Sequence, residues 1–204
     1  MTIQDVSLPR PQASRARILW QRFSRNRAAV LGLILFVVVV LIAVFADVIA
    51  PGDPLRRAGN PLTWPFVNAA TPLGTDQLGR DIMAGIVHGA RISLLIGVVA
   101  TMISIAIGII IGALAGYYGG WVDDTLMRVT EAFQTIPSFV LLLALVAIFG
   151  SSIENIIICI GIVSWTAPAR MVRAEFLALR KREFVDAARN LGVGNLSIIF
   201  REIL

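Results

Sequence analysis

The chain is poor in charged residues and nearly lacks cysteine and histidine. Charged residues make up 15% of its 204 positions and hydrophobic residues 57%, whereas about a quarter of an average soluble domain is charged. The single cysteine, Cys159, excludes an intrachain disulfide. The single histidine, His88, has no second ligand at the spacing of a metal site. This composition predicts a membrane protein and gives no indication of a bound metal.

The sequence also lacks the motifs of enzymes. The phosphate-binding pattern Gly-x4-Gly-Lys-Ser/Thr is absent, and so are paired carboxylates and any set of nucleophile and base. The net charge is +5, but the basic residues flank apolar segments and do not alternate with aromatic residues on a polar domain, which argues against a nucleic-acid partner. We therefore predict a chain that has no catalytic residues and needs no cofactor.

Four apolar stretches are candidates for membrane-spanning helices, each of which needs about 20 residues. They are residues 28–50, 92–117, 137–150 and 155–169. The first follows six arginines, but its apolar run is longer than the roughly 7–15 residues of a signal-peptide core, so we interpret it as a retained anchor. The last has only 15 residues between charges, so it spans only if the helix extends past Glu154 and Arg170.

The charges of the loops predict the topology. Residues 1–27 contain six basic residues against one acidic residue, residues 170–204 contain seven against four, and residues 51–91 contain four against three. Because basic residues mark the cytoplasmic side, we predict that both ends of the chain are cytoplasmic. Residues 118–131 are an exception with one arginine and three acidic residues, but acidic residues have little weight in this rule.

These assignments divide the chain into four parts. They are a cytoplasmic N-terminal segment (1–27), a first transmembrane anchor (28–50), an extracytoplasmic loop (51–91) and a membrane core (92–204) with a cytoplasmic loop at about 170–200.

Two patterns predict how the helices of the core pack. Gly108, Gly112 and Gly116 lie four residues apart in the second apolar stretch, and because small residues let helices approach closely in lipid, this row predicts a tight helix contact. Residues 122–136 have apolar positions at steps of four and three with charges on other faces, which is typical of an amphipathic helix. We expect this helix to lie along the inner interface and to continue into the third span, with Pro137 in the first turn.

The region 170–204 combines a dense block of charges with a broken helix. Apolar residues recur at helical spacing between positions 174 and 191, Gly192 interrupts the pattern, and Asn195 is placed to cap a second helix. A short helix outside the membrane can bind in a groove of a partner. The alternative is a solvated loop that only sets the topology, but topology does not require the pair Ala187-Ala188, the glycine break or the cap. We therefore favour a docking surface.

This region resembles the signature of ABC importer permeases, which reads Glu-Ala-Ala, three residues, Gly, nine residues, Ile-x-Leu-Pro. Here the corresponding residues are Asp186-Ala187-Ala188 and, three residues later, Gly192; aspartate keeps the charge of glutamate. Glu202 stands where isoleucine is usual, and Ile203 and Leu204 follow it. Four further segments, 22–27, 72–81, 89–94 and 116–123, are similar to the branch of this family that serves dipeptides, oligopeptides and nickel.

The resemblance implies an all-α fold, the core of a type I ABC importer permease, in a bacterial inner membrane. It also implies the partners: a second permease subunit, two cytoplasmic ABC ATPase subunits that hydrolyse ATP, and an external substrate-binding protein. On this analogy residues 183–195 dock on the ATPase, with Asp186, Ala187, Ala188 and Gly192 as coupling residues. Members of this branch usually have six spans, so the resemblance implies that this chain, apparently truncated at its C-terminal end, is either a fragment of a longer permease or a shortened permease.

Several alternatives stay open. The cargo is a peptide or, in the same branch, nickel or another small solute, and no residue is assigned to substrate binding. A channel or secondary transporter without an ATPase belongs to a different class, which intramembrane charges or broken half-helices would favour. A membrane subunit that does not itself transport is the remaining alternative. In every case membrane lipid surrounds the apolar spans.

Overall fold

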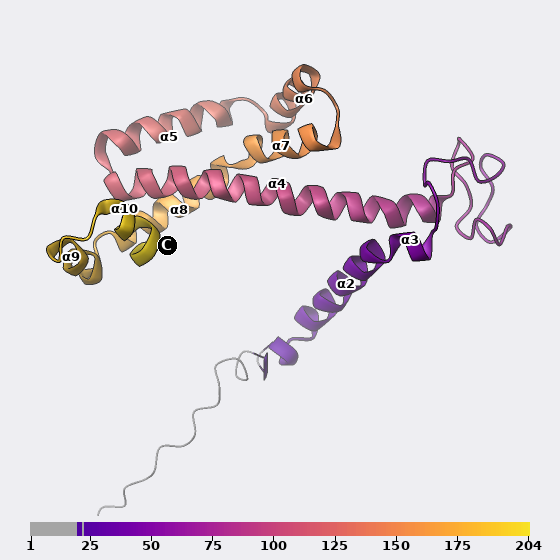
Figure 1. The fold of residues 1–204 in the computed structure, drawn as a ribbon, viewed down its shortest axis with the longest axis horizontal. Helices are drawn as coiled ribbons and strands as arrows, with labels where there is room; N and C mark the ends of the chain where they lie inside the picture. Colours follow the sequence, from indigo (N-terminus) through magenta and orange to yellow (C-terminus); the bar gives the residue numbers. More distant parts are fainter. Residues whose placement is uncertain (1–19, 22) are drawn as a thin grey trace, which may run out of the picture. The chain divides into compact units, whose positions relative to one another are not determined.

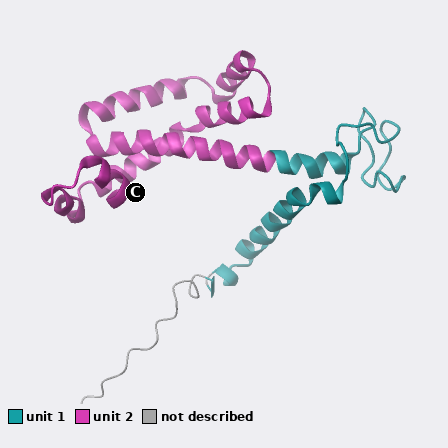
Figure 2. Ribbon diagram, viewed as in Figure 1, with its two compact units in different colours: residues 1–92 teal, residues 93–204 magenta. Residues whose placement is uncertain are grey.

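The computed structural model describes residues 20–21 and 23–204 (Figure 1). Most of the predicted cytoplasmic N-terminal segment therefore lies outside the described residues. The described part consists of helices and one long loop, with three isolated β-bridges in that loop. The predicted all-α fold class is thus confirmed. The chain forms two compact units, residues 1–92 and 93–204, which are described separately (Figure 2).

The first unit contains a helix over most of the predicted anchor. Helix α2 (Arg27–Val44) begins where the side chain of Asn26 accepts hydrogen bonds from the backbone N–H groups of Ala28 and Ala29, as an N-cap does. It has a mean hydropathy of 2.9 and few buried residues, as expected of a helix surrounded by lipid. The chain turns at Phe45 and continues as the short helix α3 (Ala46–Ile49).

The long helix α4 (Ile82–Tyr118) begins earlier than the second apolar stretch, so residues 82–91 of the predicted loop are helical. Its start is capped by Asp81, whose carboxylate accepts the N–H of Met83 at 2.9 Å. Two side chains of this first part reach the end of the anchor. The ring of His88 lies 2.9 Å from the carbonyl oxygen of Ala50, and Arg91 forms a 3.0 Å salt bridge with Asp47.

The second unit contains the remaining helices. They are the rest of α4, then α5 (Gly120–Thr135), α6 (Ser138–Phe149), α7 (Ile153–Ser164), α8 (Thr166–Leu179), α9 (Glu183–Asn190), α10 (Asn195–Ser197) and the π-helix η1 (Ile198–Ile203). The turn from α4 into α5 is made by Gly119 and Gly120, whose φ angles of +66° and +51° favour glycine.

The helix of residues 122–136 is observed as α5, but its predicted continuity with the third span is wrong. The axes of α5 and α6 differ by 85°. The residue before a proline avoids the helical region, and Ile136 accordingly adopts an extended backbone with φ −87° and ψ 126°. Pro137 therefore precedes α6 as its N-cap and does not lie in its first turn.

The number of spans depends on how these bent pairs are counted. Within the described part of the chain, α2 and α4 are each long and apolar enough to cross a membrane. The pairs α5–α6 and α7–α8, bent by 85° and 41°, bring the number of spans there to four if each pair is one span. The 12 residues of α6 measure only about 18 Å at 1.5 Å per residue, so α6 cannot cross a hydrocarbon core of about 30 Å alone. Helix α8 runs to Leu179, well beyond the predicted membrane boundary at Ala169.

Candidate coupling site

The predicted docking segment folds as a short helix that ends in a left-handed glycine. Helix α9 begins after Arg182, whose backbone is extended, and has Glu183 and Asp186 in its first turn and Arg189 in its last. This distribution of charge complements the helix dipole. Gly192 has a φ of +78°, and its N–H donates to the carbonyl of Arg189 at 2.9 Å. A glycine in this conformation is the usual end of an α-helix.

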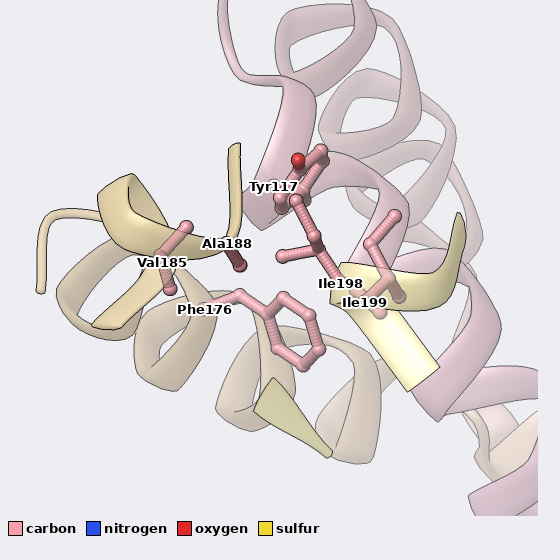
Figure 3. Packing of buried hydrophobic residues seen from close by; sticks show 7 residues of the cluster. Tyr117, Phe176, Val185, Ala188, Ile198 and Ile199 are labelled. Atoms are coloured by element: carbon pink, nitrogen blue, oxygen red, sulfur yellow. The ribbon is translucent and has the colours of Figure 1, made fainter. Parts of the chain in front are cut away.

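Helix α9 has one buried and one exposed face. Val185 and Ala188 on the buried face belong to an apolar cluster that also contains residues of α4, α8 and η1 (Figure 3). The other members of this cluster are Ala113, Tyr117, Phe176, Ile198 and Ile199. Asp186 and Ala187 are exposed. The four predicted coupling residues thus divide: Ala188 is buried, and Asp186, Ala187 and Gly192 are exposed.

Tyr117 connects α9 and α10 to the end of α4. Its side chain is only 4% exposed, its hydroxyl donates to the side-chain oxygen of Asn195 at 2.9 Å, and the guanidinium of Arg189 lies 5.3 Å from its ring centroid. The prediction that Asn195 caps a second helix is wrong. Asn195 is the first residue of α10, and its N-cap, Gly194, makes no side-chain hydrogen bond. Sequence reasoning gave Tyr117 no role, although its position beside Tyr118 at the end of an apolar stretch is typical of an interfacial aromatic residue.

The row of three glycines lies against α8. A Cβ atom at Gly108 would lie 2.6 Å from the Cβ of Pro168, and one at Gly116 would lie 2.5 Å from the Cβ of Phe176. At Gly112 a Cβ atom would meet the backbone of α8 at Ala169 and the side chain of Val172. Only glycine permits so close an approach of two helices. The two helices are thus in backbone contact over about two turns.

An ion pair joins α8 to α5 as well. The guanidinium of Arg173 donates to both carboxylate oxygens of Asp123, at 2.5 and 2.7 Å. Asp123 is only 8% exposed, whereas 34% of the Arg173 side chain is exposed, so this bidentate pair is partly shielded from competing water. Sequence reasoning counted Asp123 only as a loop charge, because nothing in the local pattern relates it to a residue 50 positions away.

Two family models match the chain. Residues 108–204 match the binding-protein-dependent transport system inner membrane component, and residues 14–66 match the N-terminal transmembrane domain of oligopeptide transport permease C. The chain belongs to this permease family. The first match begins at Gly108, the first residue of the glycine row, and includes α9 and Gly192.

Curated relatives of the permease are similar over most of its length. It is 36% identical over 206 residues to the glutathione transport system permease protein GsiD of Pectobacterium atrosepticum, covering 99% of this chain and 66% of the relative. It is 38% identical over 201 residues to the di/tripeptide transport system permease protein DppC of Pseudomonas aeruginosa, covering 96% and 66%. With the dipeptide permease protein DppC of Bacillus subtilis the identity is 32% over 198 residues, covering 97% and 62%. The permease thus spans a little under two thirds of the length of these relatives.

Proposed function

We propose that the permease is the membrane-spanning subunit of an ABC importer that moves dipeptides or oligopeptides into the cytoplasm, and that α9 docks on a partner ATPase. The observation that carries this proposal is the division of α9 into two faces. Val185 has no exposed surface, whereas Leu191 at the end of the helix is 83% exposed. Exposed Phe184 and Leu196 flank the same segment. An apolar surface around an exposed helix is what a groove on a partner can bind.

The buried face of α9 explains how a movement of the ATPase would reach the membrane. Val185, Ile198 and Ile199 are fully buried, and burial of each such side chain contributes about 1.5–3 kcal/mol. The segment is therefore fixed on Tyr117 of α4 and Phe176 of α8. Because these two helices are themselves in backbone contact along the glycine row, a displacement of α9 would move them together.

The proposal includes the partners and the orientation. ATP hydrolysis takes place on two cytoplasmic ABC ATPase subunits, a second permease subunit completes the pore, and an external protein delivers the cargo. Both ends of this chain are cytoplasmic, as the arginine-rich residues 1–27 and the basic residues of 170–204 favour. The exposed face of α9 then lies on the side of the membrane where the ATPases are.

A peptide cargo is favoured by the names of the relatives. Those reported above are named for dipeptides, di- and tripeptides or glutathione, and glutathione is itself a tripeptide. Nickel remains the second candidate from the sequence resemblance, without a named relative here to favour it. ATP hydrolysis by the assembled complex, challenged with peptides, glutathione and nickel in parallel, distinguishes these cargoes.

Charge reversal on the exposed face tests the docking. Asp186→Lys is expected to abolish co-purification of the ATPase subunits with the permease, because the substituted side chain lies on the docking face. Glu175→Lys is the matched control, since Glu175 is exposed on the neighbouring helix α8. Loss of the ATPase subunits from the Asp186→Lys permease but not from the Glu175→Lys permease supports docking through α9. Normal co-purification and normal cargo-stimulated hydrolysis with Asp186→Lys would exclude it.

A further inference from the structure

A groove with charges of both signs, about 940 Å³ in volume, lies between α5 and α8 in the second unit. Its charged lining consists of Asp124, Arg128, Glu131, Arg170 and Arg173. The charge of Arg173 is already balanced, because its guanidinium donates to both carboxylate oxygens of Asp123, which does not line the groove. Two basic and two acidic side chains remain. The groove is therefore mixed in charge and close to neutral overall.

The four remaining charges are free to meet a ligand. Among the described residues, Asp124, Arg128, Glu131 and Arg170 take part in no salt bridge, and all four are exposed. Arg170 is nevertheless held in position, since its guanidinium donates to the side-chain oxygen of Gln134 at 3.1 Å. A guanidinium held in this way loses little further freedom when it binds a carboxylate.

The contact of α8 with α4 puts the groove at the end of an apolar span. Gly108 of α4 lies against Pro168 of α8. Gly116, about two turns later, lies against Phe176. From Ser93 onward α4 has no charged residue, and at 1.5 Å per residue the two glycines are about 22 and 35 Å from Ser93 along the helix. The hydrocarbon core is about 30 Å thick. Because ionisable side chains at such a depth face water or the interior of an assembly, the groove faces away from lipid.

The spacing of two groups in the groove matches the ends of a dipeptide. Glu131 precedes Gln134 by three residues on α5, so their side chains start about 5–6 Å apart on one face of the helix. Gln134 in turn holds the guanidinium of Arg170. An extended residue is about 3.3–3.6 Å long, so the two charged ends of a dipeptide are about 7 Å apart. One end can therefore meet Arg170 while the other meets Glu131.

We infer that this groove binds a zwitterionic short peptide, with Arg170 as the ligand of its α-carboxylate and Glu131 as the ligand of its α-ammonium group. The inference rests on the proposed function, which makes a peptide the cargo, and it adds a cargo contact at the end of α4 that the proposed orientation puts on the cytoplasmic side. Guanidinium and carboxylate groups form charge-assisted, often bidentate, hydrogen bonds. A metal cation suits the groove less well, because Arg128 and Arg170 would repel it.

Binding of radiolabelled alanylphenylalanine tests the groove. The assembled importer is reconstituted without its external protein in phosphatidylcholine nanodiscs. Arg170→Gln is expected to raise the Kd of the peptide about 5-fold, which corresponds to about 1 kcal/mol for a partly exposed charge pair. The same variant is expected to bind the peptide amide as the wild type does, because the amide has no carboxylate to lose. Glu131→Gln is expected to raise the Kd of the peptide by a similar factor and to leave that of its N-acetyl derivative unchanged.

Two variants serve as matched controls. Glu175→Gln and Arg201→Gln each remove one exposed charge outside the groove, and both are expected to leave the Kd of the peptide unchanged. Equal losses in these controls would show a general charge effect and would overturn the inference. A loss in Arg170→Gln that is as large for the amide as for the peptide would show that the carboxylate is not the contact.

Two further outcomes overturn the site. The first is the absence of peptide binding to the wild-type complex at millimolar concentration. The second is loss of binding when phosphatidylethanolamine replaces phosphatidylcholine, which would assign the groove to a zwitterionic lipid headgroup. Peptide-stimulated ATP hydrolysis, measured with the external protein present, separates the site from the proposed function. Stimulation with unchanged affinities in both variants overturns the groove alone, whereas peptide binding without any stimulation overturns the peptide importer.

Discussion

Replacement of Gly112 by alanine is the most direct perturbation of the contact between α4 and α8. A Cβ atom at this position would lie 2.8 Å from the Cβ of Val172 and 3.0 Å from the backbone nitrogen of Arg173, and closer still to the carbonyl oxygen of Ala169. Two of these three atoms belong to the backbone of α8. They cannot rotate away as the end of a flexible side chain could, so the helices must separate.

The expected loss of stability follows from two opposing effects. Overpacking of a close contact costs about 1–3 kcal/mol, and the rigid backbone at Gly112 favours the upper half of this range. Alanine gains at most about 1 kcal/mol over glycine within a helix. The net loss is then about 1–2 kcal/mol, which corresponds to a Tm lowered by about 2–8 °C for a chain of this size.

Gly97 provides a control on the same helix. A Cβ atom there meets nothing within 4 Å, so Gly97→Ala keeps only the gain in helix propensity and is expected to raise the Tm by up to about 2–4 °C. The melting temperature can be followed with a fluorogenic maleimide, because the single cysteine, Cys159, is 2% exposed and reacts only on unfolding. A Gly112→Ala permease that melts at or above the temperature of Gly97→Ala would refute the close contact.

Two further predictions concern the ion pair and the glycine after α9. Asp123→Asn weakens the bidentate pair with Arg173 and is expected to lower the stability by about 1–2 kcal/mol in the same melting assay. The control Asp124→Asn, at the exposed neighbouring residue, is expected to lower it by less than about 0.5 kcal/mol. Equal shifts of the Tm in the two variants would contradict a special role of Asp123. Gly192→Ala forces an alanine into the left-handed conformation, which costs about 1–2 kcal/mol. The variant is therefore expected to speed hydrogen exchange of the α9 amides about 5- to 30-fold. Gly194→Ala is the control, because Gly194 has a φ of −65° and a Cβ atom there would meet nothing within 4 Å. It is expected to leave the exchange rate unchanged. An equal effect of the two alanine substitutions would exclude a requirement for the left-handed glycine.

Local patterns predicted those parts of the site that depend on neighbours in sequence. The apolar runs predicted the helices α2 and α4, and the glycine break at Gly192 predicted the end of α9 within two residues of Asn190. The bend of 85° after α5 was missed, although its cause, Ile136 before Pro137, is local. It was missed because the amphipathic pattern continues up to the proline and a pattern of apolar residues does not report the direction of the chain.

Residues whose role depends on distant contacts could not be predicted in this way. Asn195 has the composition and position of a helix cap, but Tyr117, 78 positions earlier in the chain, competes for its side chain and binds it. The same holds for Asp123, which is 8% exposed and pairs with Arg173, 50 positions later in the chain.

The sequence by itself determined that this chain has the apolar helices of a membrane protein, where those helices lie, and near which glycine the helix of residues 183–190 ends. These properties follow from hydropathy and from the backbone preferences of glycine and proline, which act over a few residues. Only the tertiary structure decided which face of α9 is buried. That choice depends on side chains of α4, α8 and η1 that meet α9 in space, and it leaves Asp186 and Ala187 exposed while Ala188 is held in the core.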